Sequence, residues 1–297
     1  MYQLISFSWK YLEESNKYLP QMKWFDSETK ASQIIDLPNF QFYAKLSANK
    51  SCTGYYSETG YHACASNTQL YSSTASQCDA CERIQGFKSA FLMGRNPNSR
   101  MEEYLSQDHL IYIAYFEPGI LKVGTVAKSR KFIRLIEQDA LIYTFIAESS
   151  GRNIQKIERY ISKNFNITET VKSSHKIKFL SQKPDLDKAR DLINSAFNRI
   201  ASKIDSSLEE ELKFKLYKGS LEIIDISNSS ALYFPSNFQK LSQEVNLVGN
   251  FKGIRGRNLI IENATKDYAL DTDFLVGRYI DHIDEYTYNE ENQLTLL

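Results

Sequence analysis

The four cysteines of this 297-residue chain all lie between residues 52 and 81, and two of them form a C-x-x-C pair. Thiolates are soft ligands that select zinc, and a close pair with two outlying sulfurs can complete a tetrahedron. The intervening residues are mainly Ser, Thr, Gly, Asn and Tyr, which bury little apolar surface, so a metal ion would supply missing folding energy. Four sulfurs leave no open coordination position. We therefore expect a structural zinc site with four ligands: Cys52, Cys64, Cys78 and Cys81.

Three other interpretations of these cysteines remain open from sequence. Two disulfides would fit the even count, but residues 1–17 do not have the pattern of an export signal, so we expect a cytoplasmic protein, in which disulfides are rare. A redox C-x-x-C normally opens a helix after a strand, and no strand pattern precedes Cys78. His62 lies two residues before Cys64 and is an alternative to one of the cysteine ligands.

Residues 109–160 show a clear succession of local patterns. Residues 110–116 and 120–126 are apolar and β-prone and flank the turn sequence Glu117-Pro118-Gly119, which predicts a β-hairpin. Apolar residues then recur at helical spacing in 132–136, residues 140–147 form another strand pattern, and Ile154, Ile157 and Ile161 mark one stripe of an amphipathic helix. The sequence therefore predicts the order β-β-α-β-α.

Positive charge is concentrated in the middle of a chain that has no net charge. Residues 82–134 contain nine basic and five acidic side chains, and residues 147–183 contain eight basic and three acidic ones. Such stretches are either ordinary solvated surface or a face that follows phosphate groups, with nearby Tyr and Phe available to stack on bases. Nucleic acid is the partner that we expect.

Composition places the chain among soluble globular proteins, with 42% hydrophobic and 24% charged residues. No apolar run approaches the roughly 18 residues of a membrane span, so we expect a cytoplasmic protein without a membrane segment. We expect an α+β fold in three parts: an N-terminal β-rich region with the zinc site (1–107), the central block (108–183), and two helices followed by a small β-sheet or barrel-like unit (184–297).

The chain as a whole resembles the family catalogued as domain of unknown function 2797. The resemblance covers most of the chain and rests on four groups of residues. These are the cysteine cluster with His62, the segment 109–116 with Lys122-Val123-Gly124-Thr125, Arg134 followed by Glu137-Gln138-Asp139-Ala140, and the segment 253–260.

Residues 109 to about 163 also resemble the GIY-YIG nuclease superfamily. This resemblance implies that Tyr112 acts as general base or orients water, that Arg134 steadies the phosphate charge with Arg130 as the reserve, and that Glu158 binds one Mg²⁺. Two positions depart from the pattern: Lys122 replaces the second tyrosine, and Gln138 stands where a histidine would follow the arginine. The expected catalytic residues are Tyr112, Lys122, Arg134 and Glu158, and the expected nucleic-acid contacts are Lys122, Lys128, Arg130 and Arg134.

These observations support three hypotheses from different classes. The first is a zinc-stabilised, Mg²⁺-dependent hydrolase of phosphodiester bonds in DNA or RNA. The second is a non-catalytic protein that binds structured RNA, such as tRNA, through a degenerate site of the same kind. The third is a scaffold whose basic middle meets acidic protein partners.

Overall fold

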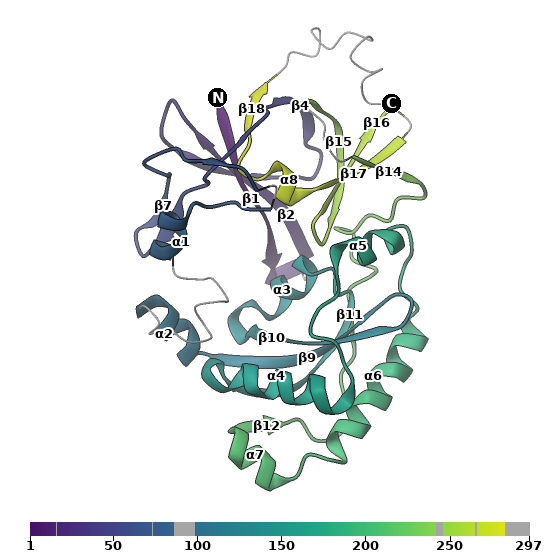
Figure 1. Ribbon diagram of the computed structural model, residues 1–297. Helices are drawn as coiled ribbons and strands as arrows, with labels where there is room; N and C mark the ends of the chain where they lie inside the picture. The colour runs from purple at the N-terminus through teal and green to yellow at the C-terminus, as the bar shows by residue number, and fades with distance from the viewer. Residues whose placement is uncertain (16, 73, 86–98, 242–245, 265, 283–297) are drawn as a thin grey trace. The chain divides into compact units, whose positions relative to one another are not determined.

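The computed structural model describes residues 1–15, 17–72, 74–85, 99–241, 246–264 and 266–282, and it is a mixed α+β structure, as expected (Figure 1). The chain divides into two compact units, one from residues 1–94 and 235–297 and the other from residues 95–234. This division differs from the three consecutive segments expected, because residues 184–234 belong with the central block and the last residues belong with the first. The basic stretch 82–134 includes residues 86–98, which lie outside the described residues.

A nine-stranded sheet forms the main part of the first unit. Its strands, in spatial order, are β14 (Phe238–Leu241), β17 (Lys266–Asp271), β16 (Asn258–Asn263), β15 (Asn246–Arg255), β4 (Gln41–Leu46), β18 (Tyr279–His282), β1 (Tyr2–Leu12), β2 (Lys17–Asp26) and β3 (Ser32–Asp36). The short helices η1 (Glu13–Ser15) and α8 (Thr272–Leu275) complete this part.

Strand β4 shows why the two ends of the chain share this sheet. Its side chains alternate in burial, with Phe42, Ala44 and Leu46 inside, so one face of the strand belongs to a core. Both of its edges are paired by strands from near the C-terminus, β15 on one side and β18 on the other. The described C-terminal strands are therefore part of one sheet with the N-terminal strands, and among the described residues they do not make the separate β-unit that we expected.

The cysteine region follows β4 and contains only short elements. Strands β5 (Lys50–Ser51) and β8 (Gln69–Leu70) pair with each other, and β6 (Tyr55–Ser57) and β7 (Gly60–His62) form a hairpin between them. Helix α1 (Asp79–Gln85) closes the region. Because these elements are too short to bury a core of their own, the region needs another source of stability.

The second unit has the predicted β-β-α-β-α order. It comprises β9 (Asp108–Phe116), β10 (Ile120–Ala127), α3 (Lys131–Glu137), β11 (Ile142–Ser150) and α4 (Gly151–Phe165), with η3 (Lys128–Arg130) before α3. Strand β9 lies between β10 and β11 and is antiparallel to both. Eight successive residues of β9, from His109 to Phe116, are buried, which explains why the sequence of this strand is mainly apolar without alternation.

Helices cover this sheet through a shared apolar core. Helix α4 contributes the expected stripe of Ile154, Ile157 and Ile161, and helix α6 (Leu186–Ala201) contributes Ile193 and Ile200. The remaining elements of the unit are α2 (Ser99–Ser106), α5 (Ser173–Lys176), η4 (Ile177–Phe179), α7 (Ser206–Leu212), β12 (Phe214–Leu216) and β13 (Ile224–Asp225). Helix α6 thus belongs to the central sheet and not to the C-terminal segment.

None of the described helices combines the length and the apolar character that crossing a lipid bilayer requires.

Candidate functional site

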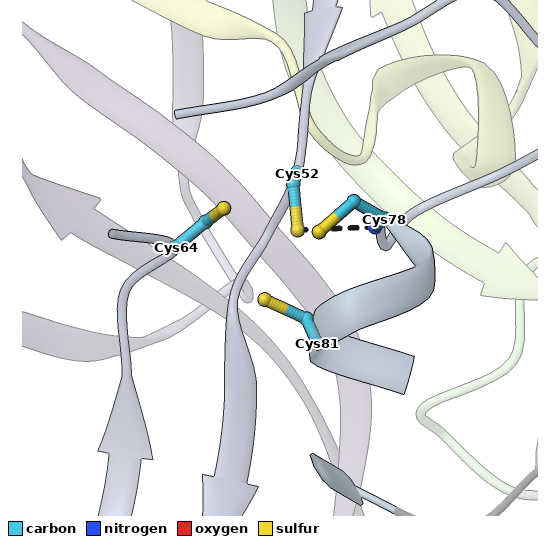
Figure 2. A group of neighbouring side chains, drawn as sticks. All are labelled: Cys52, Cys64, Cys78 and Cys81. Carbon is cyan, nitrogen blue, oxygen red and sulfur yellow. Dashed lines mark hydrogen bonds between the residues drawn. The ribbon is translucent and has the colours of Figure 1, made fainter. Parts of the chain in front are cut away.

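The four cysteines lie together at the junction of the short elements (Figure 2). Cys52 directly follows β5, Cys64 comes shortly after β7, Cys78 directly precedes α1, and Cys81 lies within that helix. Their sulfur atoms are all within 4.8 Å of one another, and all four are free thiols. Four sulfurs bound tetrahedrally to zinc at about 2.3 Å would be about 3.8 Å apart, so small side-chain movements would complete the geometry. The cluster can bind a metal ion.

Backbone amide groups are directed at the sulfur of Cys52. The N–H groups of Gly54 and Cys78 donate to Cys52 Sγ at 3.4 and 3.2 Å. Gly54 has a φ of +76°, and a Cβ atom at this position would lie 2.0 Å from the carbonyl oxygen of His62. Only glycine therefore allows the loop to place its N–H group beside the sulfur. This loop holds Cys52 in a position to act as a ligand.

The surroundings of the cluster lower the thiol pKa of some of the cysteines and raise that of others. Burial opposes ionisation of Cys64, but hydrogen bonds from the backbone at Thr68 and Ser66 outweigh it and lower the pKa of Cys64 to about 6. Burial raises the pKa of Cys52 to about 11. Since a thiolate is the form that binds metal, a cation would also have to ionise the more buried sulfurs.

His62 is oriented away from this role. Its Nε2 atom lies 2.7 Å from Ser57 Oγ and 3.0 Å from Thr59 Oγ1, and its ring stacks on Tyr55 at 5.0 Å between centroids. Among the described residues, the potential metal-binding group comprises the four cysteines without His62. The imidazole instead stabilises the turn of the β6–β7 hairpin.

The second candidate site is built around Tyr112 in the middle of β9. Tyr112 is fully buried and is paired in register with Gly124 on β10. A Cβ atom on Gly124 would lie 2.3 Å from both the ring and the hydroxyl oxygen of Tyr112. The missing side chain of Gly124 therefore makes the space in which the Tyr112 ring lies across the hairpin.

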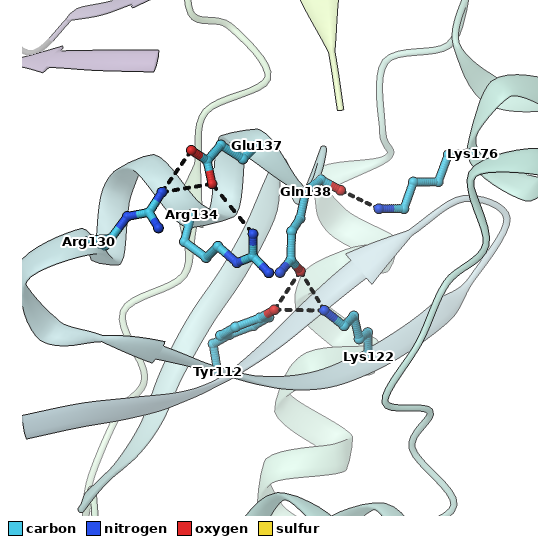
Figure 3. A network of polar contacts seen from close by, with 7 residues as sticks. All are labelled: Tyr112, Lys122, Arg130, Arg134, Glu137, Gln138 and Lys176. Carbon is cyan, nitrogen blue, oxygen red and sulfur yellow. Dashed lines mark hydrogen bonds and ion pairs between the residues drawn. The ribbon is translucent and has the colours of Figure 1, made fainter. Parts of the chain in front are cut away.

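The side chains of Lys122 and Gln138 both contact the Tyr112 hydroxyl group (Figure 3). Tyr112 donates to Gln138 Oε1 at 2.7 Å, and Lys122 Nζ donates to the Tyr112 hydroxyl oxygen at 2.8 Å. Lys122 also donates to Gln138 Oε1, while Lys176 donates to the backbone carbonyl of Gln138. Gln138 directly follows α3 and thus ties the end of this helix to β9, β10 and α5. We call Tyr112, Lys122, Arg134, Gln138 and Lys176 the Gln138 cluster.

The basic residues of the α3 region make different contacts. Arg130 pairs with Glu137 at 2.9 Å, and Arg134 pairs with the same carboxylate at 3.6 Å. The guanidinium group of Arg134 points toward Gln138 and Tyr112 (Figure 3). Lys128 pairs with Glu148 at 3.5 Å instead. Of the four cations expected to contact nucleic acid, Lys122 and Arg134 belong to the Gln138 cluster.

Electrostatic interactions connect Glu158, on α4, with this cluster. The Glu158 charge acts on both Tyr112, whose pKa is raised mainly by burial, and Lys122. Burial and the nearby Glu169 raise the pKa of Glu158 to about 7, whereas burial and Lys176 lower the pKa of Lys122 to about 8. Arg134 is a neighbouring cation and acts to lower the pKa of both Tyr112 and Lys122. Glu158 and Arg134 thus each act on both Tyr112 and Lys122.

Sequence reasoning did not identify the roles of Gln138, Lys176 and Glu169. The sequence marks Gln138 only as the position where a histidine is missing, and Lys176 is one of eight basic residues between 147 and 183. Both Lys176 and Glu169 follow α4, where the chain returns to β10 and Val123 N–H donates to Thr168 O at 2.9 Å. No local pattern in the sequence indicates such a return, because it depends on long-range contacts such as the bridge between Lys122 and Thr168.

Comparison with known proteins places the chain in a family. Residues 44–276 match the model of a family described as "Protein of unknown function (DUF2797)". No curated protein matches the chain, and no solved structure matches it. The matched range includes the cysteine cluster and the whole second unit.

Proposed function

Because the chain belongs to the DUF2797 family, whose description assigns no activity, we propose a function from its own residues. The protein is a zinc-stabilised cytoplasmic protein that acts on nucleic acid. Its Gln138 cluster, together with Glu158, is a GIY-YIG-like site that hydrolyses phosphodiester bonds in DNA or RNA with Mg²⁺. The observation that carries this proposal is that Lys122 and Gln138 both bind the Tyr112 hydroxyl group within one β-β-α-β-α block that also carries Arg134 and Glu158.

The zinc ion has a structural role in this proposal. Cys52, Cys64, Cys78 and Cys81 hold it, and their soft sulfur atoms are the donor set that zinc prefers. Because the surrounding elements are too short for a core, the metal provides the cross-link that orders the loop, the hairpin and α1.

Each residue of the catalytic site has a separate task. Lys122 and Arg134 bind the phosphate oxygens and offset the negative charge that grows as water attacks phosphorus. Tyr112 orients the attacking water, and its ring position is fixed by Gly124 and Gln138. Glu158 holds Mg²⁺, which supplies Lewis-acid stabilisation of the phosphate when it is bound. Lys128 and Arg130 contact the nucleic-acid backbone farther along the strand.

Non-catalytic binding of structured RNA is the second candidate. Two departures from the GIY-YIG pattern favour it: in that resemblance Lys122 replaces the second tyrosine, and Gln138 replaces the histidine. A glutamine amide cannot take up a proton, and Lys122 donates to the Tyr112 oxygen, so proton removal from water has fewer routes than in a complete site. In this candidate the same cations hold phosphate without cleaving the chain.

A cleavage and binding screen with the full chain separates the two candidates. Labelled single-stranded DNA, branched DNA and structured RNA are incubated with the zinc-loaded protein, with and without Mg²⁺. The nuclease proposal predicts cleavage of at least one substrate only when Mg²⁺ is present. Salt-dependent binding without cleavage would support the second candidate instead. Neither cleavage nor binding of any of them would contradict both.

A further inference from the structure

The segment after α4 lies outside the β-β-α-β-α block, yet it is attached closely to the β9–β10 hairpin. Asn166 ends α4 in the left-handed conformation with φ +55°. The carbonyl oxygen of Thr168 then accepts a hydrogen bond from the N–H group of Val123 on β10. Farther along, His175 Nε2 lies 2.8 Å from the carbonyl oxygen of Glu117, in the turn of the hairpin. Residues 166–176 are thus attached to the middle of β10, at Val123, and to the turn before it, at Glu117.

This attachment positions Lys176 beside the site. Its Nζ atom donates to the backbone carbonyl of Gln138 and lies 4.7 Å from the centre of the Phe116 ring. Figure 3 shows Lys176 and Lys122 approaching Gln138 from different directions, one at its backbone oxygen and the other at its side-chain oxygen. Gln138 therefore accepts hydrogen bonds from two ammonium groups, that of Lys122 on β10 and that of Lys176 on α5.

The charges of the Gln138 cluster are arranged as in an anion-binding site. Lys122 donates to two neutral oxygen atoms, those of Tyr112 and Gln138, and Lys176 and Arg134 both make its protonation less favourable. Glu158 acts on Lys122 in the opposite direction, and Arg134 also pairs with Glu137, but the three cations still repel one another around Gln138. A phosphate group offers several oxygen acceptors and would relieve this repulsion.

We propose that Lys176 is a phosphate-binding residue of this site and that residues 166–176 form one wall of it. The inference rests on the proposed function, since it takes the phosphate to be part of a nucleic-acid backbone. Lys122 and Arg134 contact that phosphate from the sheet and from α3, and Lys176 contacts it from α5. Through Lys176, the segment favours binding of a nucleic-acid backbone with one of its phosphate groups beside Gln138, at the end of α3.

A purely structural role for Lys176 predicts a different result. Lysine often caps the last carbonyl groups of a helix, and Gln138 directly follows α3. In that case, loss of the ammonium group would lower stability and leave phosphate affinity unchanged once the protein is folded. Thermal stability and affinity must therefore be measured on the same variants.

The test compares Lys176→Met with Lys178→Met, which removes the same charge from an exposed position two residues away on η4. Binding of fluorescein-labelled single-stranded DNA and hairpin RNA is measured by anisotropy at several salt concentrations. We expect Lys176→Met to weaken binding about tenfold and to reduce the slope of log K against log salt by about 0.7–0.9, the value of one phosphate contact. Lys178→Met should change affinity less than about twofold, and Lys176→Arg should restore most of the loss, because arginine also binds phosphate.

Equal effects of Lys176→Met and Lys178→Met would overturn the inference, as would a lower melting temperature of Lys176→Met without a change in affinity or slope. If the wild-type protein binds no oligonucleotide, the proposed function fails, and inorganic phosphate then tests the inference separately. Phosphate should shift the side-chain amide NMR signals of Gln138 in the wild-type protein and in Lys178→Met, but not in Lys176→Met. Absence of that shift in the wild-type protein would also overturn the inference.

Discussion

Replacing Cys52 with serine is expected to release zinc and unfold the cysteine region. Cys52 is buried, and its sulfur accepts two backbone N–H groups in addition to facing the other three sulfurs. Structural zinc contributes about 10–16 kcal/mol in small zinc-binding peptides, or about 3 kcal/mol for each of four ligands, so one lost thiolate should weaken zinc binding at least about a hundredfold. Elemental analysis would measure zinc per chain, and limited proteolysis would detect opening between residues 50 and 85.

His62→Ala is the control for this experiment. Its imidazole contacts Ser57 and Thr59 in the hairpin turn, so zinc content should remain that of the wild-type protein. Zinc loss in His62→Ala with retention in Cys52→Ser would show that the histidine is the ligand. Full zinc content in both variants would contradict a site made of the four cysteines.

Replacing Glu158 with glutamine is expected to lower the rate of Mg²⁺-dependent cleavage by about a hundredfold to a thousandfold, the range for one group that stabilises transition-state charge. Glutamine keeps the size of the side chain but removes the negative charge that holds the cation. Cleavage rates of the variant and of Glu210→Gln, an exposed substitution on α7, would be compared at saturating Mg²⁺. An unchanged rate in Glu158→Gln would exclude Glu158 as the metal ligand.

The pH dependence of the wild-type protein follows from the same groups. Glu158, with a pKa of about 7, must lose its proton to bind Mg²⁺, and Lys122, with a pKa of about 8, must keep its proton to bind phosphate as a cation. Cleavage should therefore rise as the pH increases through about 7 and fall above about 8. Bound Mg²⁺ would lower the first pKa and bound phosphate would raise the second, so saturation with either should widen this range.

Without Mg²⁺, the stability of the folded protein should fall as the pH rises through the pKa of Glu158, whereas the cleavage rate rises over the same range. The pKa of this carboxyl group is raised from 4.5 to about 7 in the folded protein, so the folded state binds the proton more tightly. The resulting stabilisation is fully present below pH 4.5 and is lost as the pH rises through about 7. Glu158→Gln should remove this dependence, which denaturant unfolding at several pH values would measure as a change on the order of 1 kcal/mol.

Local patterns in the sequence were sufficient to predict the central block. The turn at Glu117-Pro118-Gly119 and the stripe of Ile154, Ile157 and Ile161 depend on neighbouring residues alone, and the structure has the hairpin and helix where they were expected. The cysteine cluster was predictable for a similar reason, because four thiols close in sequence can meet without a long-range rearrangement. All four sulfurs do lie together.

Long-range pairing explains what the sequence did not reveal. The partners of β4 are β15 and β18, about two hundred residues away, and nothing in residues 41–46 specifies them. The same holds for Lys176 and Glu169, which reach the site only because the chain returns beside β10 after α4. Gln138 gained its role from its position at the end of α3, where it accepts hydrogen bonds from three other residues.

The central claim is that a nucleic-acid phosphate binds at the Gln138 cluster, and it holds for a nuclease and for a binding protein alike. Its most direct test is the oligonucleotide affinity of the double variant Lys122→Met/Arg134→Met against Lys156→Met/Lys163→Met, which removes two exposed charges from α4. The claim predicts that the first variant loses at least about a hundredfold in affinity at low salt. Its slope of log K against log salt should fall by the amount that about two phosphate contacts contribute, while the second variant keeps most of its affinity. Equal affinities of the two variants would contradict it.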